Sequence, residues 1–363
     1  MRGSIVKVIS ALIVLCLCAC PSPQIRQRDP DANKTYTAPQ AVFFDASRKG
    51  DMPAVMRLLE EKLVDVNATD AYRWTGLMYA IQYGHESLAE YFLIKKANFN
   101  QQDKDGLTPL MIAVNERRPS IVELLLEAGA DPAKQDKHGY TALMWSIYNK
   151  SWDSIPLLLT TGKGIDLQNG FGETALHLAL DYRIHDIAAL LIKHKASVAL
   201  ADDKRRTPLH LAAEKGDPLI VQALIARGAP LNAQDNRGET PLMKCIQARH
   251  PSLAAFLLTR PQDVNLRNSQ GQTALHLAAS YNLPDVATLL VQKKSHINLQ
   301  DKDGYTPLML AAQYGSDKMV VFLVEHQANA ALKNAAGQRA LDLARLRNQQ
   351  ATIEYLEKTR KKQ

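Results

Sequence analysis

The sequence has almost no cysteine beyond its first twenty residues. Of its four cysteines, Cys16, Cys18 and Cys20 lie at the start, and Cys245 stands alone in the body of the chain. One isolated cysteine cannot form an intramolecular disulfide, so no disulfide staples the body of the fold. The strongly apolar run at residues 8–18 is also too short for a membrane-spanning helix, which needs roughly 20 apolar residues.

Catalytic and metal-binding motifs are lacking as well. HExxH, CxxC and GxSxG do not occur, and we predict no catalytic residue, no metal site and no cofactor. The formal net charge is +7, which becomes 7 − 2 = +5 without Arg2 and Lys7 of the N-terminal leader. The only basic cluster is Arg360, Lys361 and Lys362, which we interpret as a solvated tail. A nucleic-acid partner would need a broader basic patch, so we predict none.

The first nineteen residues have the order of a secretory signal peptide. Arg2 and Lys7 precede the apolar run, and the small Ala19 comes directly before Cys20. The segment LCAC at residues 17–20 resembles the lipobox of bacterial lipoproteins, in which cleavage before the cysteine exposes it for acylation. The resemblance implies a signal peptide at 1–19 and a lipid anchor on Cys20 that holds the chain stably at a membrane. A plain secreted protein with incidental cysteines is the alternative.

The segment after Cys20 favours a tether. Residues 20–41 contain four prolines and no periodic apolar pattern, which predicts a lipidated, flexible stalk. We therefore expect the body on the periplasmic side of the cell envelope. Pro21, in place of Asp, follows the lipidated residue, and by resemblance to enteric sorting rules this favours the outer membrane over the inner one.

A short motif recurs every 33 residues without insertion or deletion. It begins at Thr75, Thr108, Thr141, Thr174, Thr207, Thr240, Thr273 and Thr306, and Arg339 closes the series at the same spacing. The segment TPLHLA at residues 207–212 matches T-P-L-H-x-A at every defined position, so the sequence resembles the ankyrin-repeat family. The resemblance implies an all-α solenoid of about ten helix-turn-helix units with short turn or hairpin tips. It covers residues 42–358, with a degenerate N-terminal cap at 42–74, a C-terminal cap at 339–358 and a basic tail at 359–363.

The physics of each unit can be read from its residues. Asp and Gly ahead of the threonine predict a tight turn, and the threonine hydroxyl is expected to cap the first helix. Gly84, Gly216 and Gly315 are expected to end that helix. One slot in the first turn of the second helix holds proline in five units: Pro53, Pro119, Pro218, Pro251 and Pro284. Pro156 instead falls inside a second helix, where we expect a kink and a locally distorted repeat.

Several residues of types that can bind metals or react chemically are interpreted as structural. His177, His210 and His276 take the fourth position of the motif, which other units fill with methionine, so that slot does not select a metal ligand. Cys245 takes a small-residue slot and is expected to be a buried, inert thiol. Trp145 and Trp152 map onto core slots, and we predict that both pack inside.

Tyrosines recur in slots that should face a concave groove. In the implied fold, the turn tips and the first helices line that groove, and tyrosine and tryptophan are the residues most enriched in binding hot spots. The alternative is that these rings are half-exposed without a binding role. Arg206, Arg237, Glu173 and Glu239 occupy tip positions between them and would tune specificity. The predicted contact residues are Trp74, Tyr83, Tyr140, Tyr148, Tyr182, Tyr281, Tyr305 and Tyr314.

The function that these patterns favour is protein binding without catalysis. A lipobox joined to an ankyrin array resembles the immunity lipoproteins that are paired with lipase effectors of type VI secretion systems. The resemblance implies a partner that is a secreted toxic effector, neutralised by steric masking. The alternative function is a resident scaffold that supports an enzyme or complex of the envelope.

Overall fold

The computed structural model describes residues 36–314 and 316–360. The chain divides into two compact units, at residues 1–104 (unit 1) and 105–363 (unit 2). The predicted leader, the lipid anchor on Cys20 and most of the stalk lie outside the described residues, as do Gly315 and the last three residues of the tail. The described part contains twenty helices and a single isolated bridge, between Thr69 and Thr75, so the predicted all-α class is confirmed.

Unit 1 contains two helix pairs. Its helices are α2 (Ala38–Lys49), α3 (Met52–Glu60), α4 (Gly76–Tyr83) and α5 (Glu86–Ile94). Thr37 caps α2, which therefore begins at Ala38 and takes in residues 38–41, which we had expected in the stalk. Phe43 and Phe92 form an edge-to-face pair with ring centroids 5.8 Å apart and fill the core of this unit.

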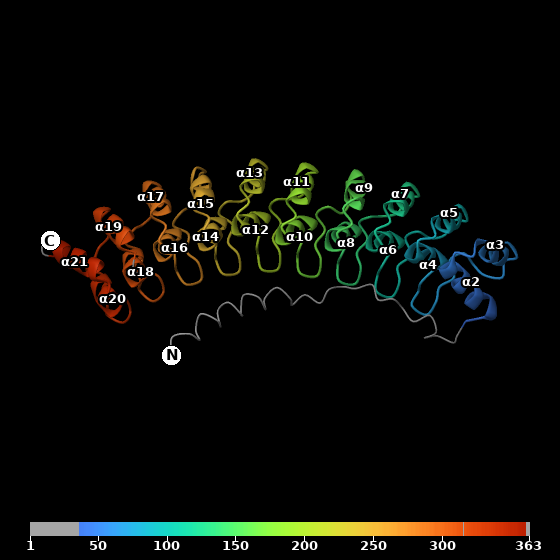
Figure 1. Cartoon of the computed structure of the whole chain (residues 1–363), viewed down its shortest axis with the longest axis horizontal. Helices are drawn as coiled ribbons and strands as arrows, with labels where there is room; N and C mark the ends of the chain where they lie inside the picture. Colours follow the sequence, from blue (N-terminus) through green and yellow to red (C-terminus); the bar gives the residue numbers. More distant parts are fainter. Residues whose placement is uncertain (1–35, 315, 361–363) are drawn as a thin grey trace. The chain divides into compact units, whose positions relative to one another are not determined.

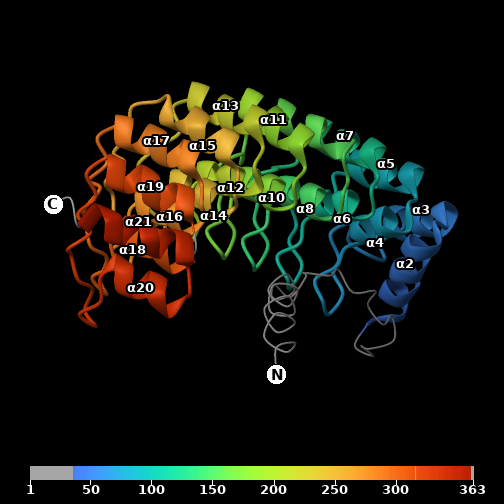
Figure 2. The ribbon, with the colours of Figure 1, turned by 60° about the vertical axis from the view of Figure 1, so that its left-hand side comes forward.

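Unit 2 repeats one helix pair eight times. The first helices are α6 (Pro109–Asn115), α8 (Ala142–Tyr148), α10 (Ala175–Asp181), α12 (Pro208–Lys215), α14 (Pro241–Gln247), α16 (Ala274–Ser280), α18 (Pro307–Tyr314) and α20 (Ala340–Leu346). The second helices are α7 (Pro119–Glu127), α9 (Ser154–Thr160), α11 (His185–Lys193), α13 (Pro218–Ala226), α15 (Pro251–Leu258), α17 (Pro284–Gln292), α19 (Asp317–Glu325) and α21 (Gln350–Arg360). Within this unit the first helices form one row and the second helices another, with a tip projecting beside each first helix (Figures 1 and 2).

Threonine begins the first helices as predicted. In six of them the threonine Oγ1 accepts the backbone N–H of the residue three positions later, at 3.2–3.4 Å. This bond satisfies one of the amide groups that a helix leaves unpaired at its N-terminus. At the other end, Gly84 and Gly216 close their helices in the left-handed conformation, each with φ of 79°, where a residue without a side chain is least strained.

Side-chain amides hold neighbouring tips of unit 2 in register. The Nε2 of Gln135 donates to the carbonyl of Gly139 in its own tip and to that of Gln168 in the next, at 2.7 and 2.8 Å. Gln168, Gln234 and Gln300 make the same pair of bonds, and Arg267 makes it with its guanidinium. Ala201 stands in this slot in one repeat, where the side chain cannot make either bond.

The expected kink at Pro156 is not present. The second helix of that repeat begins at Ser154, so Pro156 is its third residue and lies in the first turn. The first four amides of a helix have no partner within the helix, and proline therefore removes no bond there. The prediction was wrong because it placed the helix start at the slot of Trp152, where prolines begin α7, α13, α15 and α17. The repeat is altered by a shorter second helix, not by a bend within it.

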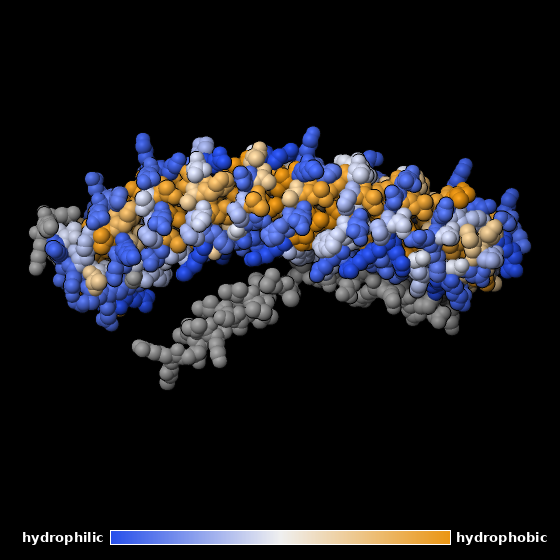
Figure 3. All heavy atoms as spheres, turned by 45° about the horizontal axis from the view of Figure 1, so that its top comes forward, coloured by the Kyte–Doolittle hydropathy of each residue, from blue (hydrophilic) through white to orange (hydrophobic). Residues whose placement is uncertain are grey.

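The core of each unit lies between the two rows of helices. Each first helix of unit 2 from α6 to α16 buries its first six residues, as in α10, where residues 175–180 are all buried. The second helices bury only one side, and Figure 3 shows apolar side chains gathered in a band on the side of unit 2 that carries them, with hydrophilic residues along its borders. None of the described helices is long and apolar enough to cross a membrane.

Candidate protein-binding surface

The predicted contact residues divide into exposed, half-buried and buried groups. Tyr182 and Tyr314 in unit 2 are 50% and 60% exposed, and Tyr83 in unit 1 is exposed as well. Tyr148, Tyr281 and Tyr305 are half-buried. Trp74 and Tyr140 are buried, with 1% and 4% of their surface accessible. The expectation that these two rings face a partner is therefore corrected.

Turn bonds and ring packing together hold Trp74 and Tyr140 inward, whereas Tyr305, which makes the same turn bond to Asp301, is only half-buried. The backbone N–H of Tyr140 donates to Oδ1 of Asp136 at 2.9 Å, and the ring then packs on Trp145 with centroids 6.1 Å apart. In unit 1, Trp74 donates from its backbone to Asp70 at 2.7 Å and from its indole Nε1 to Asp103 at 2.8 Å. Both rings are core residues whose polar groups are satisfied inside the fold.

A chain of aromatic rings leads from this core to the surface of unit 2. Tyr140 contacts Trp145, which meets Tyr148 edge to face at 6.2 Å, and Tyr148 meets Tyr182 of the next repeat at 6.3 Å. The buried Trp145, whose predicted packing role is confirmed, is itself fixed by an indole bond to Asp136 of 3.0 Å. The half-buried Tyr148 and the exposed Tyr182 thus have a rigid support. We call Tyr140, Trp145, Tyr148 and Tyr182 the aromatic ladder.

Trp152 differs from its prediction. It was expected in the core, but it is 38% exposed and precedes the second helix α9. The shifted start of α9 leaves this residue in the turn, so its ring is on the surface.

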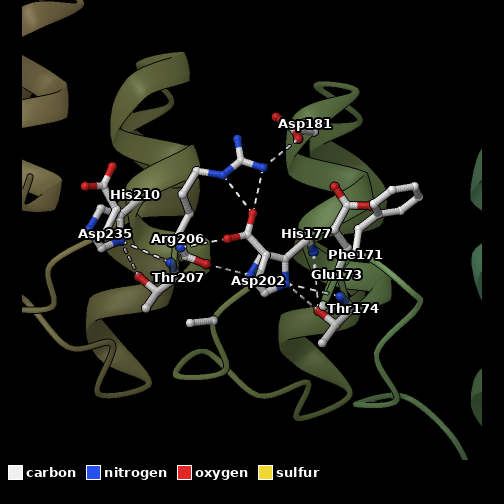
Figure 4. Close-up of polar contacts among 12 residues, drawn as sticks. Phe171, Glu173, Thr174, His177, Asp181, Asp202, Arg206, Thr207, His210 and Asp235 are labelled. Carbon is white, nitrogen blue, oxygen red and sulfur yellow. Dashed lines mark hydrogen bonds and ion pairs between the residues drawn. The ribbon is translucent and has the colours of Figure 1, made fainter. Parts of the chain in front are cut away.

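An ion-pair network lies beside the ladder, between α10 and α12. Figure 4 shows the guanidinium of Arg206 directed at two carboxylates, with Nη2 at 2.7 Å from Asp202 and 3.5 Å from Asp181. Lys215 reaches Asp181 from the end of α12 at 3.4 Å. Asp202 is buried, whereas Asp181 is partly exposed at the last position of α10. The network fixes the end of one first helix against the next tip, and it leaves one carboxylate accessible to a partner.

A second network in the next repeat is more deeply buried. Lys244 contacts Glu239 and lies 2.9 Å from Asp235, and Gln247 donates to Glu239 at 2.7 Å. Burial by itself lowers the pKa of Lys244, but the two carboxylates outweigh it and raise the pKa. This cluster was not predicted from the sequence. Its signal was a lysine in a slot that Leu178, Leu211 and Leu277 fill elsewhere.

The pKa of the Glu173 carboxyl is raised. Burial is the main cause, and the nearby charge of Asp181 adds to it, while a bond from Asn169 at 3.0 Å opposes them. Phe171, in the same tip, is 43% exposed. The surface around the ladder therefore combines exposed rings with fixed charges of both signs.

A model of the family described as ankyrin repeats, in three copies, matches the chain in overlapping stretches at residues 13–103, 43–136, 90–169, 143–235, 209–301 and 288–362. The matches cover most of the sequence and agree with the 33-residue helix pairs. The chain belongs to the ankyrin-repeat family. Ankyrin repeats form protein–protein interaction modules, and proteins built from them are typically binding scaffolds without catalytic activity.

The three motif histidines hold the ankyrin repeats together. In His210, Nδ1 accepts the backbone N–H of Thr207 at 3.1 Å, while Nε2 donates to the carbonyl of Glu239 in the next repeat at 3.0 Å. His177 and His276 make the same contacts. Burial lowers the pKa of all three. Their structural assignment is confirmed, because both ring nitrogens are used within the fold.

Cys245 is fully buried in α14, and burial raises its pKa to about 12. Its thiol donates to the carbonyl of His250 at 3.3 Å. A thiol with so high a pKa has almost no thiolate at neutral pH, so it is a poor nucleophile. Within the described part of the chain, His, Cys, Asp and Glu nowhere form a group of three or more that could hold a metal ion.

The ankyrin units also carry two open hollows away from the ladder. One of about 410 Å³ lies between α13 and α15, where Pro218, Arg249 and Phe256 contribute to its walls. The other, of about 420 Å³, lies in unit 1 near Gly50, Gly84 and His85. Both are shallow surface features, and the charged and aromatic residues described above are not part of them.

Proposed function

We propose that the chain is a lipid-anchored, non-catalytic immunity protein that binds and masks a toxic secreted enzyme of the lipase class. The aromatic ladder carries this proposal, because it presents two rings on a rigid support beside fixed charges. Exposed aromatic rings on a preorganised surface lose little conformational entropy on binding. Such a surface suits tight association with a folded protein.

The lipid anchor would place the binding surface at the membrane. Cys20 in a lipobox-like segment would hold the array at the periplasmic face of the envelope, with the outer membrane favoured by Pro21. A phospholipase acts at that surface, so an anchored inhibitor meets the enzyme where it reaches its substrate. Masking needs no chemistry from this chain, only a surface that covers the enzyme's active site.

A killing assay tests the immunity function. We expect a native strain from which the gene is deleted to be killed by contact with its parent, and to survive beside a parent whose secretion system is inactive. Restoring the gene should restore survival, whereas a gene with Tyr148→Ala and Tyr182→Ala should not. Equal survival of the deleted strain beside both parents would contradict immunity and favour an envelope scaffold instead.

The anchor is tested separately in the same assay. Cys20→Ser should leave the secreted array folded but unanchored, and protection should fall. Cys18→Ser is the control for the neighbouring cysteine and should protect as the unaltered gene does. Full protection by Cys20→Ser would mean that the anchor is not needed for the function.

A further inference from the structure

The tip before Thr207 in unit 2 differs from the other tips of this unit at two positions. The residue two positions before the threonine is glycine with positive φ in every other repeat of unit 2: Gly106, Gly139, Gly172, Gly238, Gly271, Gly304 and Gly337. Arg205 takes this slot with φ of 58°. The same tip holds Ala201 in place of the glutamine that ties neighbouring tips together. In unit 1 the glycine slot also holds an arginine, Arg73.

Arginine is costly in this slot for two reasons. A left-handed backbone is strained for any residue with a side chain, and a Cβ added at the glycines of this slot would crowd the next tip. At Gly172 it would lie 2.7 Å from the backbone nitrogen of Asp203, and at Gly139 2.9 Å from the Cα of Asn169. The side chain of Arg205 is exposed, so burial of this side chain does not offset the strain.

Arg205 belongs to a cluster of exposed cations on two adjacent tips. Lys204 precedes it, and Arg237 lies on the next tip, which the backbone bond from Asn236 to the carbonyl of Lys204 holds at 2.9 Å. We call Lys204, Arg205 and Arg237 the basic tip. Within the described residues none of the three forms an ion pair, and Asp203 is the one acid among them.

The fold does not supply the missing counter-charge. Apart from Asp203, the acids closest in sequence are Asp202 and Asp235, which are buried and already paired with Arg206 and Lys244. In the flanking tips, the positions that match Asp203, Lys204, Asn236 and Arg237 hold Gly170, Phe171, Ser269 and Gln270, which have no charge, and the nearest flanking acid, Glu173, is partly buried. The excess positive charge is thus two tips wide and open to a partner.

From these observations we infer that the basic tip binds an acidic segment of a protein partner. The inference rests on the proposed function and names the chemistry of the partner's contact region. The patch is too short for an extended phosphate backbone, and Asp203 would repel one, whereas a few carboxylates on a protein surface match three cations. Charge pairs at the edge of an interface mainly raise the association rate and exclude wrong partners.

The test uses the full chain in a non-ionic detergent and a fluorescent peptide rich in Asp and Glu, compared with its Asn and Gln counterpart. We expect the acidic peptide to bind about tenfold more tightly than the amide peptide, and added salt to remove the difference. Lys204→Glu with Arg237→Glu should abolish that preference. Lys302→Glu with Lys333→Glu makes the same change of formal charge at exposed positions elsewhere and should leave it intact.

Equal affinity for the two peptides would overturn the inference, and so would an equal loss of affinity in both double variants. It would also be overturned if single-stranded DNA or phosphatidylglycerol vesicles bound more tightly than the acidic peptide and lost as much affinity in the variant Lys204→Glu with Arg237→Glu. A partner captured from the native strain with the affinity-tagged chain separates this inference from the proposed function. If that partner loses affinity for the chain with Tyr148→Ala and Tyr182→Ala but keeps it for Lys204→Glu with Arg237→Glu, the proposed function stands and the acidic contact does not.

Discussion

Single residues of this protein act mostly across the boundary between one repeat and the next. His177, His210 and His276 each cap their own helix with one ring nitrogen and reach the following repeat with the other. The sequence predicted their structural role, because methionine fills the same slot elsewhere. It could not show that Trp74 and Tyr140 turn inward, because their burial also depends on the rings of Tyr79 and Trp145, on which they pack. The position of a residue in a tip predicts where its backbone lies, but not whether its side chain points inward or outward.

The histidines predict a loss of stability in weak acid. Burial lowers their pKa in the folded chain below the ordinary value of 6.5, so the unfolded chain binds protons first as the pH falls. The free energy of unfolding should therefore decrease as the pH drops below about 6.5, which denaturant titrations at several pH values would measure. Replacing all three histidines with Met should flatten this dependence. An unchanged slope in that variant would contradict the assignment.

Arg205 predicts opposite effects on stability and on binding. Arg205→Gly should raise the free energy of unfolding by about 0.5–1 kcal/mol, because glycine adopts positive φ without strain. The same change should weaken binding of the acidic peptide. Arg183→Gly is the matched control, since Arg183 is exposed and also has a positive φ, of 58°, but lies at the end of a first helix. It should gain stability without losing peptide affinity. A loss of stability in Arg205→Gly would show that the arginine serves the fold.

At the scale of elements, the 33-residue period predicted nearly every helix, because each unit repeats the same cap, turn and apolar pattern. It failed at α9, where Pro156 and Trp152 are both explained by a helix that begins at Ser154. Ser151, just before this helix, is buried, and its hydroxyl shares a hydrogen bond of 2.9 Å with that of Ser154. A periodic pattern fixes which helices exist more reliably than where each one begins.

Proline at equivalent positions of α7 and α9 should therefore have different costs. Glu123 lies 33 residues before Pro156, but α7 begins at Pro119, so Glu123 is in its second turn. Glu123→Pro should lower the free energy of unfolding by about 3 kcal/mol, because it removes a helical hydrogen bond. Pro156→Glu should change it by less than about 1 kcal/mol. Similar large effects at both positions would mean that α9 begins earlier than described. Denaturant titration of the two variants distinguishes these results.

At the scale of the whole molecule, the sequence predicted a binding array and most of its exposed rings, but not the polar contacts between repeats. The pairing of Arg206 with Asp181 joins residues from adjacent repeats, and Lys244 meets both Asp235 and Glu239. Such pairs depend on how side chains meet in three dimensions, which a slot number does not encode. The pair of Arg206 with Asp181 places charges beside the aromatic ladder and so shapes the surface that a partner would meet, whereas the cluster around Lys244 is buried.

The most direct test of the central claim is to capture the partner from the native strain with the affinity-tagged chain and to measure its affinity for two matched double variants. Tyr148→Ala with Tyr182→Ala removes the exposed end of the ladder, whereas Trp152→Ala with Leu219→Ala removes two exposed apolar side chains associated with the second helices. We predict a loss of about 2 kcal/mol or more, about 30-fold in Kd, for the first variant and little change for the second. A larger loss for the second variant, or none for the first, would contradict binding through the aromatic ladder.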